Sequence, residues 1–255
     1  MRLGICNFVF PRINAAAVSD VLALCDVIDF APTVHGFRWP QACPPVNRLF
    51  SKPVRISCLQ SIFFGVAEAS LVRCELAFEA MSTHVQTVCR WGRRLDAEGL
   101  VFGAPSLRSG GTQQQAVVES RLLNLHEQVE RHGLRLYLEA VSPRFGTEFI
   151  PSSADLLSLI SRVPRLHLHL DVGQMVEEGQ NPMQVLTTYR ERLGHLHLSV
   201  PDLGMPSPDM VSLWKEILRL MKGSTISVVV EVQNLNHTQS ADLVDLMMEL
   251  RATVE

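Results

Sequence analysis

The stretch LRLYLEAVSPRFGTEFIPSSADLLSLISRVPRLHLHLD, residues 134–171, decides the fold class of this chain. It begins and ends with short apolar runs, 134–139 and 166–171, and between them apolar residues recur at helical spacing over 154–160. Ser152 and Ser153 are the candidates to cap that helix. A strand, a helix and a second strand in this order predict two parallel strands joined by a right-handed crossover.

The same unit recurs along the chain. Apolar runs typical of strands are found at 3–8, 27–31, 54–59, 100–103, 134–139, 166–171, 195–200 and 226–232. Helical periodicity is found at 15–24, 67–91, 113–131, 154–160, 182–193, 210–221 and 240–250. The second crossover is the exception, because its prolines leave only 46–50 as a short helix. Eight units of about 32 residues each predict the α/β class and a single (β/α)₈ TIM barrel, with residues 1–255 as one domain.

The composition narrows the classes of partner. A net charge of -3 gives no basic field for phosphate backbones, so no nucleic-acid partner is expected. No apolar run approaches the roughly 20 residues of a spanning helix, and the N-terminus resembles a strand rather than a signal peptide, so we expect no membrane partner and a cytoplasmic location. The six cysteines form no CxxC pair and are expected to be reduced thiols.

Four strand ends carry a side chain that can bind a metal. These are Glu139 in LYLE, Asp171 in LHLD, His197 in HLHLS and Glu231 in VVVE. They are 32, 26 and 34 positions apart, about one repeat each, and parallel strands of a barrel deliver their carboxyl ends to the same face, so the four are expected to converge. Three buried carboxylates need a counter-charge, which a divalent cation supplies. The donor set favours Mn²⁺ or Mg²⁺, with Zn²⁺ and Co²⁺ as alternatives.

A family resemblance covers nearly the whole chain. The segments that carry it are RLGICNFVF, VIDFAPT, VRISCLQSIFFG, LVFGAPSLR, LEAVSPRFGTEFI, LHLHLDVGQM, LGHLHLSVPD and VVVEVQ. They resemble the successive strands of the xylose-isomerase-like TIM barrels, a group of sugar-phosphate isomerases, ketose 3-epimerases and apurinic endonucleases. The resemblance implies that the four strand-end residues hold a metal, and that Glu139 and Glu231 are also opposed acid/base groups. The implied reaction is isomerisation or epimerisation of a small-molecule carbohydrate (a sugar, sugar phosphate or polyol) through a metal-stabilised enediolate.

One residue and one four-residue segment depart from the family's pattern. Gln174 stands where many relatives have a histidine, and residues 199–202 replace the Gly-Glu pair and the arginine that ketose epimerases carry after the strand-seven histidine. The residues around the substrate are therefore expected to differ from those of a standard ketose 3-epimerase.

Polar and aromatic residues after several strands are expected to line the mouth of the barrel. The predicted substrate-binding residues are Gln60, Arg108, Arg144, His35, Trp39 and Gln174. The two arginines are candidates to clamp a phosphate, a carboxylate or a sugar hydroxyl. His169 is expected to support a metal ligand without binding the metal itself.

Two alternative functions remain open. An apurinic-site endonuclease-like hydrolase shares the barrel but needs further His and Asp ligands for a trinuclear zinc cluster, and a basic face for DNA. A non-catalytic sugar-binding barrel would keep the fold without the reaction. The sequence also leaves a homo-oligomer open.

Overall fold

The computed structural model describes residues 1–39, 43, 50, 53–111 and 113–255. Its sheet is a closed barrel with the strand order β1-β2-β3-β4-β5-β6-β7-β8, and the described strand pairs are parallel. This confirms the predicted α/β class and (β/α)₈ architecture. The short helix predicted at 46–50 lies outside the described residues, apart from Phe50. Within the described ranges, every helix is too short or too polar to cross a membrane.

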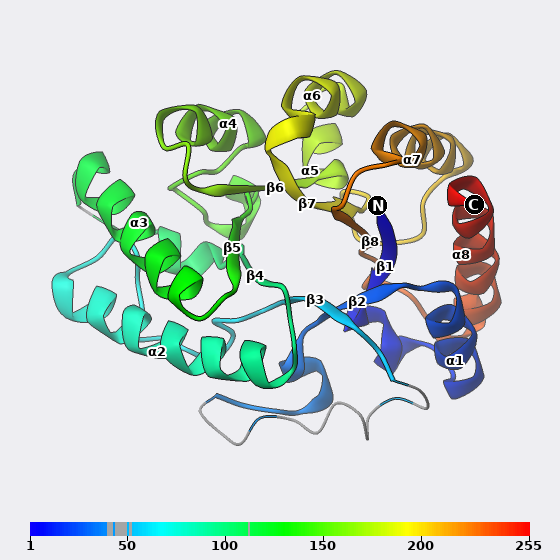
Figure 1. Ribbon diagram of the computed structural model, residues 1–255, viewed down its shortest axis with the longest axis horizontal. Helices are drawn as coiled ribbons and strands as arrows, with labels where there is room; N and C mark the ends of the chain where they lie inside the picture. The colour runs from blue at the N-terminus through cyan, green and yellow to red at the C-terminus, as the bar shows by residue number, and fades with distance from the viewer. Residues whose placement is uncertain (40–42, 44–49, 51–52, 112) are drawn as a thin grey trace. The chain divides into compact units, whose positions relative to one another are not determined.

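The strands and helices alternate along the chain (Figure 1). The strands are β1 (Arg2–Cys6), β2 (Val27–Phe30), β3 (Ile56–Leu59), β4 (Gly99–Phe102), β5 (Arg135–Leu138), β6 (His167–Asp171), β7 (Leu193–Leu198) and β8 (Ser227–Val230). The α-helices are α1 (Ala15–Leu24), α2 (Glu75–Arg94), α3 (Gln115–Arg131), α4 (Ser153–Arg162), α5 (Val172–Glu177), α6 (Pro182–Tyr189), α7 (Pro208–Met221) and α8 (Ser240–Val254). Short 3₁₀ helices follow several strands, among them η2 (Pro32–His35), η4 (Pro105–Arg108) and η5 (Pro143–Phe145).

The chain groups into two compact units. Unit 1 comprises Met1–Phe30, Pro45–Ser57 and Leu170–Glu255, and unit 2 comprises Ala31–Pro44 and Cys58–His169.

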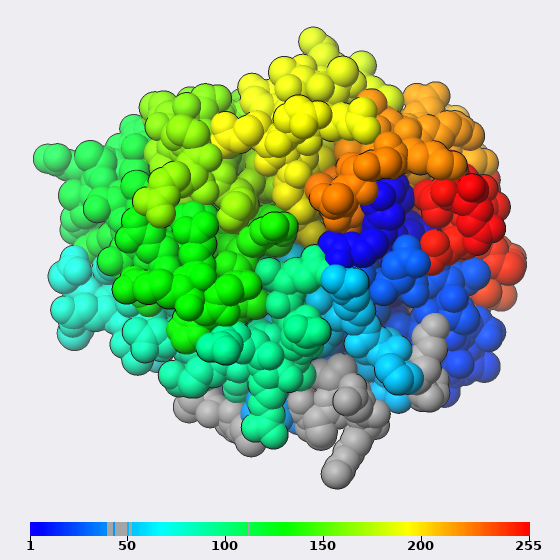
Figure 2. All heavy atoms as spheres, in the orientation of Figure 1, coloured from blue at the N-terminus to red at the C-terminus, as the bar shows by residue number. Residues whose placement is uncertain are grey.

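In unit 1, β1 pairs with β2 on one side and with β8 on the other. Gly4 permits this close pairing, because a Cβ there would lie 2.7 Å from a side-chain carbon and the carbonyl oxygen of Val27. Cys6, Val27 and Val229 form a buried apolar cluster between these strands. Figure 2 shows α8, in red, on the surface beside the blue N-terminal part of the chain, in agreement with the packing of α8 on α1.

In unit 2, β4 lies between β3 and β5 and shares a buried cluster of Cys58, Val101 and Tyr137. The predicted helix 67–91 was wrong at its start, since α2 begins at Glu75. The reason is Ser70, whose hydroxyl accepts the backbone N–H groups of residues 72 and 73 and donates to the carbonyl of Leu107. These bonds hold the chain in a turn that competes with the helix.

The cap of helix α4 was predicted from the sequence, whereas helix α5 was not. Of the two candidate caps, Ser152 accepts the N–H of Asp155 at 3.1 Å and caps α4, whereas Ser153 is the first residue of the helix. Helix α5 was not predicted, because its six residues make fewer than two turns and show no periodicity. No disulfide joins the six cysteines, all of which are among the described residues.

Candidate metal centre

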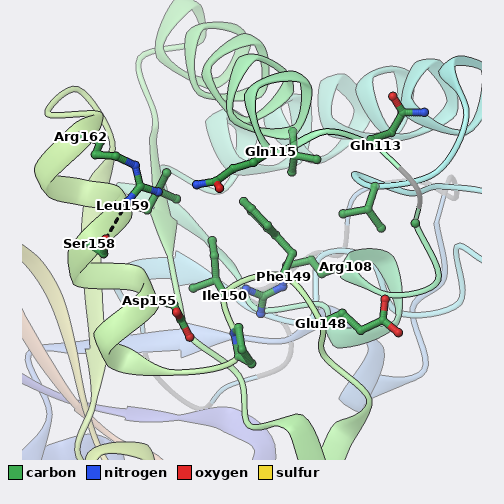
Figure 3. A pocket seen from close by; sticks show the side chains of 14 residues that line it. Arg108, Gln113, Gln115, Glu148, Phe149, Ile150, Asp155, Ser158, Leu159 and Arg162 are labelled. Atoms are coloured by element: carbon green, nitrogen blue, oxygen red, sulfur yellow. Dashed lines mark hydrogen bonds between the residues drawn. The ribbon is translucent and has the colours of Figure 1, made fainter.

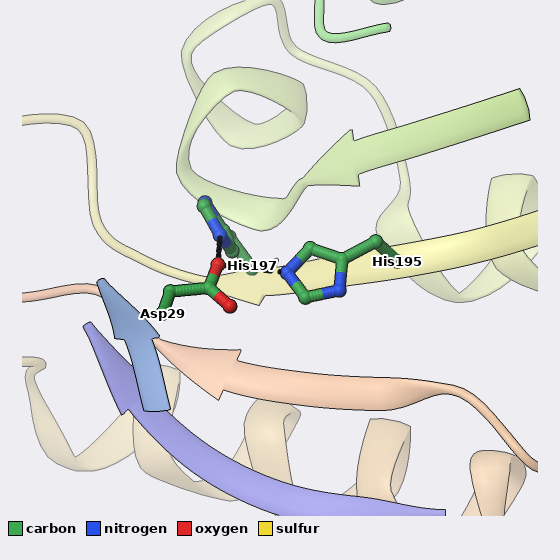
Figure 4. A group of neighbouring side chains, drawn as sticks. All are labelled: Asp29, His195 and His197. Atoms are coloured by element: carbon green, nitrogen blue, oxygen red, sulfur yellow. Dashed lines mark hydrogen bonds and ion pairs between the residues drawn. The ribbon is translucent and has the colours of Figure 1, made fainter. Parts of the chain in front are cut away.

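A buried carboxylate between two histidines is the centre of charge in unit 1. Successive side chains of a strand point to opposite faces, so His195 and His197 of β7 share one face. Asp29 of β2 lies between them, with its Oδ2 atom 2.8 Å from Nε2 of His195 and 2.9 Å from Nε2 of His197 (Figure 4). None of these residues is more than 1% exposed. Ser57 donates to the other carboxylate oxygen, so both oxygens have the partners that a buried charge requires.

The second ring nitrogen of His197 faces a strand-end carboxylate. Nδ1 lies 2.8 Å from Oε2 of Glu231, which follows β8. One donor atom from each of Asp171, His197 and Glu231 lies within 4.8 Å of the other two. Two ligands that bind one cation at right angles, with bonds of about 2.1 Å, are about 3 Å apart. The spacing of His197 and Glu231 and the donor chemistry of the three residues therefore fit a shared divalent ion.

Ser199 and the start of α5 fix the carboxylate of Asp171. The Ser199 hydroxyl is 2.8 and 2.7 Å from the two carboxylate oxygens, and it accepts the N–H of Gly173 at 3.1 Å. Oδ1 also accepts the N–H of Gln174 at 2.6 Å, so Asp171 caps α5. Residue 173 has to be glycine here, because a Cβ would lie 2.4 Å from the Ser199 hydroxyl.

The charges of this cluster depend on one another. Burial disfavours the ionised form of Asp29, but His195 and His197 outweigh burial and hold the pKa of Asp29 well below its usual range. Burial lowers the pKa of His197, whereas Glu231 and Asp29 raise it, and the net result is a pKa well above the usual range. Burial and Glu231 raise the pKa of Asp171 to about 6. A proton on His197 thus places one positive charge between carboxylates. A divalent ion bound there would place two positive charges at the same position.

Glu139 and His169 belong to unit 2. Glu139 follows β5, and its backbone donates to Phe102 at 3.3 Å and accepts from Nη1 of Arg108 at 3.0 Å. Gly103 leaves room for the carboxylate, because a Cβ at that position would lie 2.7 Å from Oε2 of Glu139. His169 of β6 is fully buried. The role of Glu139 as a ligand and that of His169 as its support stay predictions.

The predicted substrate-binding residues are spread over several loops. Gln60, after β3, is buried. Arg144 of η5 is exposed, with its guanidinium 4.7 Å from the ring centre of Phe145. Gln174 of α5 donates from its side chain to Glu178.

Two further predicted residues, His35 and Trp39, follow β2 in unit 2. Burial lowers the pKa of His35. The ring of Trp39 packs against α2, with its centre 4.2 Å from that of Trp91 and 5.3 Å from that of His84. Arg108, at the end of η4, is fully buried. The substrate-binding roles of these six residues stay predictions.

Asp29 is the residue of the cluster that sequence reasoning missed. Its signal is a single acidic residue inside the apolar run VIDF, where a charge has to be buried and therefore needs partners. Those partners, His195 and His197, are 166 and 168 positions away in the sequence. Ser199 was noted only as a departure from the family's pattern, and the structure gives it a contact with Asp171.

Known proteins resemble this chain in fold. A family model described as a xylose isomerase-like TIM barrel matches residues 63–250, and no curated protein matches the sequence. The chain is similar to the structure of 3-keto-D-glucoside 4-epimerase from E. coli, with 17% identity, a TM-score of 0.70 and 99% of each chain covered.

Two other similar structures are named for different reactions. One is the probable 3-DHS dehydratase from Bacillus anthracis, with 15% identity, a TM-score of 0.70 and 98% of each chain covered. The other is an AP endonuclease, family 2, from Brucella melitensis, with 16% identity, a TM-score of 0.67, and 94% of this chain and 95% of that chain covered. At these identities the likeness establishes the fold and not the reaction.

Proposed function

The chain belongs to the xylose isomerase-like TIM barrel family, and on this premise we propose that it is a divalent-metal-dependent isomerase or epimerase of a sugar, sugar phosphate or polyol. The observation that carries the proposal is the grouping of Asp171, His197 and Glu231, with Asp29 on the outer nitrogen of the imidazole. A carboxylate at that position is the common support of a metal-binding histidine, because it fixes the ring and its tautomer. In this proposal residues 1–255 form a single domain.

The residues have separate tasks in the proposed reaction. Asp171, His197 and Glu231 would hold the ion together with Glu139. The family resemblance assigns Glu139 as the ligand that follows strand five. The bound ion would supply positive charge beside the carbonyl oxygen of the substrate. Glu231 takes the proton from the carbon next to that carbonyl, and Glu139 returns a proton from the opposite side. Asp29 accepts a hydrogen bond from Nε2–H of His197, so that Nδ1 of the same ring is available to bind the metal.

One of the similar structures is named as an epimerase of a keto-glucoside, and this likeness supports a carbohydrate as the substrate proposed for this chain. The residues that follow His197 differ from the Gly-Glu pair of the ketose epimerases, and Ser199 instead holds Asp171. We therefore propose a substrate other than that of a standard ketose 3-epimerase.

Metal binding gives the first test. Mn²⁺ is titrated by calorimetry into chain that has been treated with EDTA, and one ion per chain is expected. Glu231→Gln and Asp171→Asn should each weaken binding by more than tenfold, because each removes a ligand. Asp20→Asn, which changes an exposed carboxylate of α1, should leave binding unchanged. A wild-type chain that binds no divalent ion contradicts the proposal.

Proton exchange gives the second test. A panel of ketoses is incubated with the Mn²⁺-loaded chain in D₂O, and deuterium at the carbon next to the carbonyl is measured by NMR. Glu139→Gln and Glu231→Gln variants that still bind metal should lose most of the exchange. Full exchange in both variants would show that these glutamates are not the acid/base pair.

The same experiments separate the two alternative functions. An endonuclease of the kind named for one similar structure should bind a duplex with an apurinic site, and should bind it more weakly as salt rises. A non-catalytic sugar-binding barrel should bind a ketose without any metal-dependent exchange. Exchange in the absence of DNA binding favours the isomerase or epimerase over both.

A further inference from the structure

Unit 2 contains a cavity of about 450 Å³ whose lining includes none of the proposed metal ligands. It lies among α3, α4 and the segments that precede them (Figure 3). The polar residues that line it include Arg108, Gln113, Glu148, Asp155 and Arg162. The apolar part of the lining includes Val72, Val118, Ile150 and Leu159. The cavity is thus large enough for a small organic molecule and has both an apolar and a charged wall.

The guanidinium of Arg108 is buried in the wall of this cavity with one edge unsatisfied. Nη1 donates to the carbonyl of Glu139 at 3.0 Å. Nε and Nη2 are buried and have no hydrogen-bond partner among the described residues. The side chain is 0% exposed, and the ring centre of Phe102 lies 5.6 Å from its central carbon. Buried N–H groups of a charged side chain are strongly unfavourable without an acceptor, so this edge requires one.

Arg108 remains a cation at neutral pH. Burial lowers the pKa of Arg108 and Glu139 raises it, and the net pKa is about 10. The group is therefore still protonated well above neutral pH. Nε and Nη2 lie on the same edge of the guanidinium plane, with parallel N–H bonds. This edge matches the two oxygens of a carboxylate, which can accept both bonds at once.

The other charged groups of the cavity already have partners. Arg162 pairs with Glu119 at 2.9 Å. Glu148 accepts the backbone N–H of Gly110 at 2.8 Å. Asp155 lies in the first turn of α4, where a negative charge is favourable. None of these carboxylates pairs with Arg108, and their presence favours a ligand with one negative charge over a phosphate dianion.

The N-terminus of α3 adds to the positive character of the cavity. Its N-cap residue, Gln114, makes no side-chain capping bond, and its first turn contains no acidic residue. Gln115, the first residue of this helix, lines the cavity. The positive end of the helix dipole is therefore not neutralised by an acidic side chain of its own helix.

We propose that this cavity binds a small organic acid, whose carboxylate accepts hydrogen bonds from Nε and Nη2 of Arg108 and whose apolar part packs against Val72, Val118 and Ile150. Figure 3 shows Phe149, Ile150 and Arg108 in the lining of the same cavity. The backbone N–H of Phe149 donates to the carbonyl of Arg108 at 3.1 Å, and its half-buried side chain is part of the lining of the cavity.

A matched pair of probes tests the proposal. Benzoate and the uncharged benzamide have nearly the same shape, and their binding is measured by ligand-observed NMR on EDTA-treated chain, so that the metal centre plays no part. The wild-type chain is expected to bind benzoate at least tenfold more tightly than benzamide. Equal affinity for the two probes, or binding of inorganic phosphate in preference to benzoate, overturns the proposal.

Variants of the cavity wall complete the test. Arg108→Met should abolish benzoate binding, whereas Arg165→Met, which changes an exposed arginine that pairs with Glu127 outside the lining of the cavity, should alter affinity less than twofold. If Arg108→Met does not fold, Ser158→Trp replaces it, because Ser158 lines the cavity from an exposed position on α4 and tolerates a larger side chain. Benzoate binding that persists in the folded Arg108→Met variant or in Ser158→Trp overturns the proposal.

Discussion

Unit 1 and unit 2 each bury a charged group, and the two groups differ in how their charge is satisfied. The Asp29 carboxylate in unit 1 accepts hydrogen bonds from His195, His197 and Ser57. The Arg108 guanidinium in unit 2 donates to one carbonyl and leaves an edge of two N–H groups without an acceptor in the described part of the chain. A buried charge with all its partners holds neighbouring groups in position, whereas one with missing partners marks a place that a ligand can complete.

The largest effect is expected from Asp29→Ala. It removes the shared partner of two buried imidazoles, and breaking a buried pair from one side costs about 3–5 kcal/mol. The free energy of unfolding in urea measures this loss. Asp20→Ala, an exposed site on α1, should change it by less than about 0.5 kcal/mol. A loss at Asp29 as small as that of the control would mean that the two histidines do not depend on the carboxylate.

Gly173→Ala should have the next largest effect. The added Cβ would lie 2.4 Å from the Ser199 hydroxyl and 2.7 Å from a backbone carbon of Val200, and such overpacking costs about 1–3 kcal/mol. The matched control is Gly204→Ala, whose Cβ would be 3.3 Å from the nearest atom, on Asp202. Urea unfolding and Mn²⁺ titration of both variants check the prediction. Equal stability and equal metal affinity in the two variants would contradict a tight Ser199–Asp171 contact.

Arg108→Met should change stability by less than about 1 kcal/mol. The substitution removes the hydrogen bond to Glu139, but it also removes a buried cation with unsatisfied N–H groups, and these two effects on stability offset each other. Replacing a buried charged group by an apolar one of similar size often leaves the free energy of unfolding unchanged. The control is Arg121→Met in the same unit. Arg121 is 5% exposed but donates to the carbonyls of residues 71 and 73 and pairs with Glu75 at 2.8 Å, so its loss should cost more. Urea unfolding of both variants gives the order of the two effects, and the reverse order would contradict the comparison.

The smallest effect is expected at the pair of Asp26 and Arg251 in unit 1, which is open to solvent. Burial raises the pKa of Asp26, but hydrogen bonds from Arg251 and from the backbone of Leu3 outweigh burial and lower it. A lowered pKa means that the pair stabilises the fold above the pKa of the unfolded chain and that this stabilisation is lost as the pH falls through the folded value.

Arg251→Gln should therefore cost less than about 1 kcal/mol at neutral pH, and less still in high salt. The difference in unfolding free energy from the wild-type chain should shrink between about pH 6 and about pH 3, where the carboxylate is protonated. A difference that grows with acidity would show that the sign of the pKa shift is wrong.

Most of the fold was predictable because it depends on local patterns. Alternating apolar runs and helical segments gave the barrel, since each strand and helix shows its own period over a few residues. The errors have local causes too. The hydroxyl of Ser70 delays the start of α2, although the apolar period continues through residues 67–74. Helix α5 is too short to show a period, and the residue that caps it, Asp171, attracted attention only as a metal ligand.

The candidate site was predictable only where its residues end strands. Asp171, His197 and Glu231 were identified because they recur at the spacing of the repeat. Asp29 was missed because it lies inside a strand and its partners come from a distant part of the chain. The buried edge of Arg108 could not be predicted either, because a sequence shows that an arginine follows a strand but not which of its nitrogens find acceptors.

The shared oxygen of Asp29 has a spectroscopic consequence. An ionised carboxylate can only accept, so Nε2 of both His195 and His197 must carry a proton, and both rings have a fixed orientation. Because both rings are buried, these ring protons are expected to exchange slowly with water and to be visible by NMR. A cation on Nδ1 of His197 would shift the nitrogen resonances of that ring far more than those of His195. The chain therefore contains a reporter of metal occupancy and, two residues away on the same strand, its internal reference.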